Sequence, residues 1–178
     1  MLSTPIITYR DPRYYAAIRM RVAIRDIPDA LPPLHPEVVA WLKKKEITPD
    51  GPPFFHYLQM TADEQLLVEV GLPVPDAVAG DDRIIGGMFP GGDYATLIHT
   101  GDYCYLMEAH MTLDAWVEEI GRCDKETIAG EGIAFGGRTE FYRTDEQEVP
   151  DPAKWETEVS FFLPPKGSRA ARFLPVTL

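Results

Sequence analysis

The second half of the sequence ends in an apolar run, and an acidic residue stands at its beginning. Glu158 precedes residues 159–163, and in an alternating strand it shares a face with Ser160 and Phe162. Such a carboxylate either faces solvent on a half-exposed sheet, which is the common case, or lies at the base of a cleft. In a cleft, loss of water makes it bind a cation or move protons. Glu69 occupies the position in the first half that matches Glu158 in the second, and this match favours the interpretation as a cleft.

Aromatic residues are the second chemical signal of the sequence. Most of them must form the core, but tyrosine and tryptophan carry polar ends that a dry core does not favour. A cleft lined by such rings and holding a carboxylate suits a flat apolar or cationic ligand. We therefore expect ligand contacts from Glu158, Glu69, Tyr57, Phe89, Tyr103, Trp116, Phe135 and Tyr142.

Other kinds of site find little support in the sequence. The four histidines lack the helical spacing of a zinc site, so we expect no metal. The glycines of Gly130–Gly137 lack the spacing of a dinucleotide-binding motif, so we expect no cofactor. This segment is interpreted as a flexible loop, a lid that bears Phe135. No Gly-x-Ser-x-Gly nucleophile motif is present.

Charge and composition narrow the range of partners. The 178 residues include 17 Lys and Arg and 28 Asp and Glu, a net charge of −11. Such a surface repels phosphate backbones and anionic lipids, so we expect no direct nucleic-acid partner and no membrane partner. It mildly favours cationic ligands, although solubility alone explains it equally well. Cys104 and Cys123 lack metal-site spacing and are expected to be reduced thiols. The N-terminal residues do not resemble a signal peptide, so we expect a cytoplasmic monomer or weak dimer.

Two similar series of strands and helices, one in each half of the chain, are expected to position these residues. Hydrophobic periodicity and turn residues predict strands over 6–9, 15–22, 54–58, 66–70, 84–88, 94–99, 139–142 and 157–163, and helices over 37–45 and 103–121. Residues 15–18 match 94–97, and residues 68–70 match 157–159. The predicted fold is α+β: two pseudo-twofold-related β-α-β-β units with antiparallel sheets and a ligand cleft between them.

The order of these segments resembles the GyrI-like effector-binding family. The resemblance is carried by Gly91–Tyr103, leading into an amphipathic helix, and by Trp155–Pro164, which looks like the family's final strand. The first half is similar through Gly51-Pro52-Pro53 and Tyr57. It implies one domain over 1–178, with halves at about 4–75 and 83–165 and a C-terminal tail at 166–178.

The resemblance also implies functions. Drug-sensing members of the family meet a cationic ligand with a carboxylate among aromatic rings, a role that transfers to Glu158 and Tyr103. Some standalone members resemble hydrolases of cyclopropane-bearing toxins, in which Glu158 would be the base and Tyr103, or Tyr57, the donor. A third alternative is a protein-binding modulator that resembles a gyrase inhibitor. Whether the protein is an enzyme stays open, as does the identity of its ligand.

Overall fold

The structure is a computed structural model and describes residues 1–165. The predicted C-terminal tail, 166–178, lies outside the described residues. The strands are β1 (Ile6–Arg10), β2 (Arg13–Ala23), β3 (Phe54–Met60), β4 (Gln65–Pro73), β5 (Ile85–Phe89), β6 (Gly92–Thr100), β7 (Lys125–Ile128), β8 (Gly132–Tyr142) and β9 (Glu156–Leu163). Most of the predicted strands agree with them to within a few residues at each end, but β8 begins at Gly132, well before the predicted 139–142, and β7 was not predicted.

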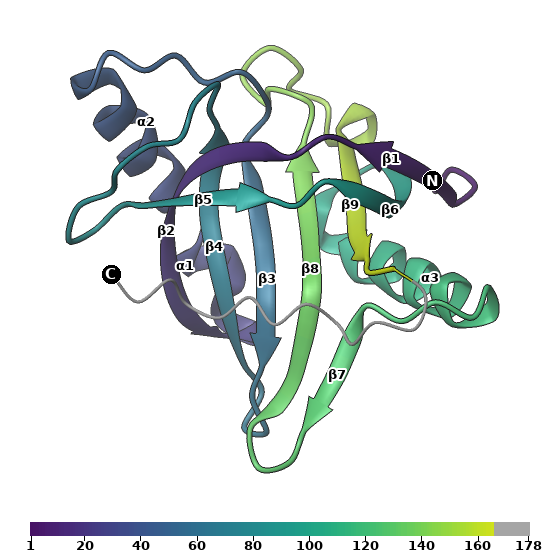
Figure 1. The fold of residues 1–178 in the computed structure, drawn as a ribbon. Coiled ribbons are helices and arrows are strands. Elements are labelled where there is room, and N and C mark those ends of the chain that lie inside the picture. Colours follow the sequence, from purple (N-terminus) through teal and green to yellow (C-terminus); the bar gives the residue numbers. More distant parts are fainter. Residues whose placement is uncertain (166–178) are drawn as a thin grey trace.

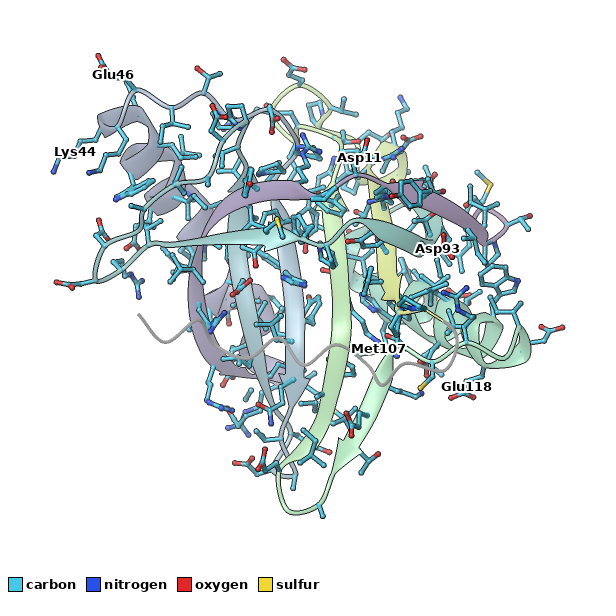
Figure 2. The ribbon with its side chains drawn as sticks, viewed as in Figure 1. Asp11, Lys44, Glu46, Asp93, Met107 and Glu118 are labelled. Carbon is cyan, nitrogen blue, oxygen red and sulfur yellow. The ribbon has the colours of Figure 1, made fainter. Side chains whose placement is uncertain are left out.

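Helices connect the strands at a few points. They are η1 (Ile24–Asp26), α1 (Ile27–Ala30), α2 (Leu34–Lys44), η2 (Tyr103–Tyr105), α3 (Leu106–Glu119) and η3 (Pro152–Lys154). The predicted helix over 103–121 is divided, because Asp102 caps η2 by accepting a hydrogen bond from the Cys104 backbone. Helix α2 ends in exposed lysines, and Figure 2 shows Lys44 pointing away from the sheet.

The strands form one curled antiparallel sheet. Its order is β1-β6-β9-β8-β3-β4-β2-β5, with β7 paired to β8. The antiparallel arrangement was predicted, but the two halves of the chain share one sheet, joined where β3 pairs β8. Figure 1 shows the sheet curling, with β1 and β5 crossing in front and α2 and α3 behind. The protein is therefore a mixed α/β fold with few helices.

Two apolar clusters lie on the side of the sheet that α2 and α3 cover, called here the helix face. Val38 and Leu42 of α2 belong to a cluster with buried residues of β2, β3 and β4. Leu113 of α3 belongs to a second cluster, together with Val159 and Phe161 of β9. The spacing of these helical residues matches one stripe per helix, so each helix packs its half of the sheet.

The other side, called the opposite face, has its own small core. Tyr15, Phe54, Phe89 and Phe141 form an aromatic cluster there. Tyr15 lies directly over Gly87 of β5, where an added Cβ would come within 2.2 Å of the Tyr15 ring. Glycine is therefore required at this position for the close approach of the ring to the backbone.

The glycine-rich segment is not a flexible loop, so that prediction was wrong. It begins the long strand β8, which pairs with β7 and β3. Gly132 and Gly137 have positive φ, 105° and 106°, and a Cβ at Gly132 would lie 2.1 Å from the Met60 carbonyl oxygen. The glycines allow the strand to twist and to approach β3 closely. Phe135 is accordingly 9% exposed and belongs to the α2-side core, not to a lid.

Candidate ligand-binding site

The helix face brings together several of the predicted site residues. Residues paired across an antiparallel sheet point the same way. Phe55 pairs with Glu140, and Glu140 with Val159 of the α3-side core, so all three lie on the helix face. Tyr57 and Tyr142 follow two residues along their strands and share this face.

Glu140 is the centre of this group. Its carboxylate is 5% exposed. Oε2 accepts hydrogen bonds from the hydroxyls of Tyr57, at 2.9 Å, and Tyr142, at 2.6 Å. Oε1 lies 2.8 Å from Nε2 of His110, which α3 supplies. A buried carboxylate thus has donors from β3, β8 and α3, which satisfies the need of a buried charge for hydrogen bonds.

The ionisation of these groups follows from the contacts. Burial by itself raises the pKa of Glu140, but the hydrogen bond and charge of His110, with the hydroxyls of Tyr142 and Tyr57, lower it overall below its usual range. Burial and the Glu140 charge raise the pKa of both tyrosines well above their ordinary value. At neutral pH the site therefore holds an anion and two protonated hydroxyl donors.

Aromatic rings extend from the carboxylate toward the surface. Tyr142 packs edge-on against Phe55 at 5.0 Å and Tyr103 at 5.2 Å between ring centroids. Tyr103 lies over Trp155 at 4.6 Å. His35 of α2 stacks on Phe55 at 5.2 Å. Tyr142, Tyr103 and His35 are partly exposed, so this side of Glu140 is the more accessible one.

A neighbouring charge network does not contact Glu140. Arg138 of β8 binds Asp124 through Nε, at 2.6 Å, and pairs with Asp114 of α3. Its guanidinium lies over the rings of Phe161, at 4.1 Å, and Phe135, at 4.6 Å. Phe135 therefore packs beneath an arginine that two aspartates hold in place.

Glu158, the first candidate from the sequence, lies on the opposite face. Arg10 Nη2 binds its Oε1 at 2.6 Å, and Arg143 Nη2 binds its Oε2. The Arg10 guanidinium also lies over the Tyr94 ring, 5.2 Å from its centroid. Two cations of the chain already meet this carboxylate. The structure does not join Glu158 to Tyr103, which packs with Tyr142 and Trp155, so the predicted catalytic pair is not assembled.

Glu69 is also on the opposite face and is fully buried. Its carboxylate accepts hydrogen bonds from Tyr15 Oη at 2.6 Å and Arg19 Nε at 2.9 Å, and it lies 3.2 Å from His56 Nδ1. Burial would raise its pKa, but His56, Tyr15 and Arg19 together lower it to about 2. The pattern is that of a structural ion pair in which the carboxylate is buried and its partner Arg19 is partly exposed.

The two remaining candidates lie away from Glu140. Phe89 belongs to the aromatic cluster of the opposite face, with Tyr15 and Phe54. Trp116 is partly buried against the α3-side core. Glu140 and His110 were missed by the sequence analysis. Alternation within the predicted strand 139–142 places Glu140 and Tyr142 on one face, and that signal would have found the carboxylate.

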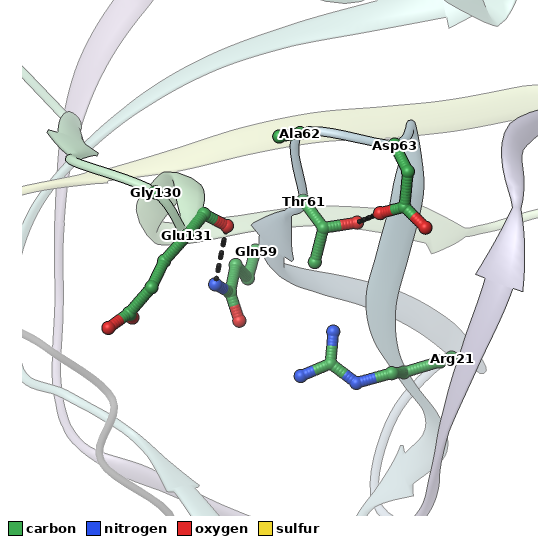
Figure 3. A pocket seen from close by; sticks show the side chains of 7 residues that line it. All are labelled: Arg21, Gln59, Thr61, Ala62, Asp63, Gly130 and Glu131. Atoms are coloured by element: carbon green, nitrogen blue, oxygen red, sulfur yellow. Dashed lines mark hydrogen bonds between the residues drawn. The ribbon is translucent and has the colours of Figure 1, made fainter.

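A surface hollow of about 560 Å³ lies elsewhere, between the β3–β4 and β7–β8 turns. Figure 3 shows Arg21 pointing into it and the hydrogen bond of 3.2 Å from Gln59 to the Glu131 backbone. Most of the side chains that line it are of polar type, and none of them is a predicted site residue. Within residues 1–165, no cluster of three or more His, Cys, Asp or Glu side chains is arranged to hold a metal ion. No helix of that region is long and apolar enough to span a membrane.

Comparison with known proteins identifies the family and the fold. The model of the GyrI-like small molecule binding domain matches residues 3–163. The sequence has no significant match among curated proteins. Among solved structures, the EcmrR C-terminal domain is 22% identical, with a TM-score of 0.72, over 90% of this chain and 97% of that one. In the EcmrR–DNA complex the likeness covers only 57% of the EcmrR chain, at a TM-score of 0.70 and 22% identity.

Two further structures share the fold at lower identity. One is SAV2435 bound to tetraphenylphosphonium, 7% identical at a TM-score of 0.61, over 92% of this chain and 95% of that one. The other is a hydrolase from Listeria innocua, 15% identical at a TM-score of 0.56, over 90% and 91% of the two chains. At these identities the likeness shows a common fold.

Proposed function

Since this chain belongs to the GyrI-like small molecule binding domain family, we propose that it binds a small hydrophobic molecule, either uncharged or cationic, on the helix face of its sheet. Glu140 lies at the base of the proposed site, and α2 and α3 flank it. One of its structural neighbours, SAV2435, is bound to tetraphenylphosphonium, a bulky aromatic cation, which suggests the first probe to use.

The observation that carries this proposal is the environment of Glu140. A buried carboxylate that is ionised at neutral pH attracts a cation more strongly than one in water, because the surrounding protein screens charge less. Its tyrosine donors, Tyr57 and Tyr142, hold the negative charge in place between two strands. The partly exposed rings beside it supply flat apolar surface, and aromatic faces attract cations as well.

We also propose that the two halves of the chain are copies of one unit, as the sequence predicts. Tyr15, Arg19 and Glu69 occupy the same register positions on β2 and β4 that Tyr94, Ile98 and Glu158 occupy on β6 and β9. On this proposal, β3 and β8 meet at the pseudo-twofold axis, and the ligand cleft lies where they pair, between the helices of the two halves.

Hydrolysis of a strained electrophile is the second candidate function, now with Glu140 in place of Glu158. A carboxylate beside two hydroxyl donors is the minimum such a reaction needs. However, the lowered pKa of Glu140 makes it a weak base, and both of its oxygens already accept hydrogen bonds. Binding is therefore the better supported function. The function of a protein-binding modulator does not require the buried cluster around Glu140.

The decisive experiment is a titration with tetraphenylphosphonium at pH 8, with two matched variants. Glu140→Gln should weaken binding by about 1.5–3 kcal/mol, the range for a hydrogen bond to a charged group. Glu158→Gln, which changes an equally buried carboxylate on the opposite face, should leave the dissociation constant within about twofold of the wild type, because that carboxylate is matched by two arginines. The reverse ranking would move the site to the opposite face.

Turnover separates the two candidate functions. Protein mixed with a large excess of a cyclopropane-bearing alkylator should sequester the compound one-to-one if it only binds. Multiple turnovers, followed by product mass and lost in Glu140→Gln, would instead establish the hydrolase.

A further inference from the structure

His110 contacts Glu140 from α3 and brings a positive charge to it when its ring is protonated. Its Nε2 lies 2.8 Å from Glu140 Oε1, and its side chain is 18% exposed against 6% for that of Glu140. The ring is held edge-on to Tyr57 at 5.7 Å and tilted over Phe161 at 5.7 Å. It therefore stands between the carboxylate and the solvent on the α3 side.

We propose that His110 determines whether the site accepts a cation, and that protonation of His110 excludes cationic ligands while admitting uncharged ones. The proposal rests on the proposed function at Glu140. When His110 carries a proton, its charge balances the carboxylate, and an arriving cation meets a like charge at close range. When His110 is neutral, the carboxylate is left unbalanced and attracts the cation. An uncharged ligand feels little difference between the two states.

Charged and titratable groups lie near this pair on several elements. They are Tyr57 on β3, Arg138 and Tyr142 on β8, His99 on β6, Tyr103 of η2, Asp114 on α3 and, beside Tyr142, His35 on α2.

Most of these groups keep one charge state from pH 5 to 8. The three tyrosines stay protonated, since burial raises their pKa. Burial lowers the pKa of His99 and of His35, so both are neutral over most of the range. The aspartate partners of Arg138 keep its guanidinium charged. Burial by itself raises the pKa of Asp114, but Lys125 and Arg138 lower it overall. Histidine is the side chain whose charge can change near neutral pH, and His110 is the histidine in hydrogen-bond contact with Glu140.

The test compares a cation with an uncharged probe at several pH values. Tetraphenylphosphonium has no titratable group, and N-phenyl-1-naphthylamine is uncharged in this range. Between pH 8 and 5.5, the dissociation constant of the cation should rise by about tenfold or more, approaching about tenfold per pH unit where His110 is mostly protonated. The uncharged probe should change less than about twofold. In His110→Gln the cation should lose this pH dependence.

His56→Gln is the matched control, because His56 also contacts a buried carboxylate, Glu69, but on the opposite face. This variant should keep the wild-type pH dependence. The proposal can also be tested without mutation, by following the protonation of the His110 ring by NMR. The midpoint of this titration should move to lower pH when the cation is bound. Equal slopes for both probes, a slope retained in His110→Gln, or an unmoved His110 titration would overturn the proposal. If neither probe binds the wild type, the proposed function fails and this inference fails with it.

Discussion

Replacement of Glu69 by glutamine should remove a large, pH-dependent part of the folding free energy. Glu69 is fully buried, and its pKa is about 2 instead of the ordinary 4.5. A carboxyl with a depressed folded-state pKa stabilises the protein above its unfolded pKa. That stability is lost as pH falls through the folded pKa. The window is therefore pH 5 to 2, with full stabilisation at neutral pH.

The size of the effect follows from the shift. A pKa lowered by about 2.5 units, at about 1.4 kcal/mol each, corresponds to about 3.5 kcal/mol at pH 7. This figure already includes the loss of the ionised acceptor by Arg19 and Tyr15, and it lies within the range of about 3–5 kcal/mol that breaking a buried pair costs. We expect Glu69→Gln to lose about 3.5 kcal/mol at pH 7 and to approach the wild-type stability as pH falls toward 2.

The assay is urea denaturation followed by tryptophan fluorescence at intervals from pH 7 to 2.5. The difference in the free energy of unfolding between the wild type and Glu69→Gln isolates the contribution of Glu69, because all other acidic residues titrate in both proteins. Exposed Glu156 gives the control variant Glu156→Gln, which should track the wild type at every pH. A wild-type advantage that stays constant with pH would refute the reasoning, since it would mean that the Glu69 pKa is the same in the folded and unfolded chain.

Two further predictions concern packing. Gly87→Ala should push Tyr15 off Glu69, because the new Cβ would overlap the ring, and should lower stability by about 1–3 kcal/mol; a crystal structure of the variant with the Tyr15–Glu69 hydrogen bond intact would contradict this. Leu113→Ala should cost about 2–5 kcal/mol in thermal or urea unfolding, while Met111→Ala, on the exposed side of the same helix at 66% exposure, should change stability by less than about 0.5 kcal/mol.

Strand pattern and helix periodicity predicted most of the fold. The alternating strands and the apolar stripe of α3 appear in the structure because burial of one face decides both. The glycine-rich segment was misassigned because glycine has no intrinsic strand preference. There, the pairing of Gly132 with β7 and its close approach to Met60 of β3 decide the conformation, and Met60 is far from Gly132 in the sequence.

The site was harder to predict than the fold. Glu158 and Glu140 are both acids within strands, and sequence alone does not show which one meets cations of the chain itself. Arg10 reaches Glu158 from 148 residues away, across paired strands. His110 reaches Glu140 from a helix whose rotation over the sheet is set by packing. Tyr57, Tyr103 and Tyr142 were chosen for their polar ends, and the structure does gather these three residues near one carboxylate.

The positions of β1 and β5 have a consequence for how the chain folds during synthesis. β1 pairs with β6, so Ile6 meets Thr96, and β5 returns to pair with β2, where Gly87 meets Tyr15. The first strand has no place in the sheet until the chain has grown past residue 100. An N-terminal fragment ending between β4 and β5 would therefore leave β1 unpaired and the edge of β2 open, a state prone to aggregation. The pairing of β1 with β6 joins segments about 90 residues apart, and contacts of such long sequence separation slow folding.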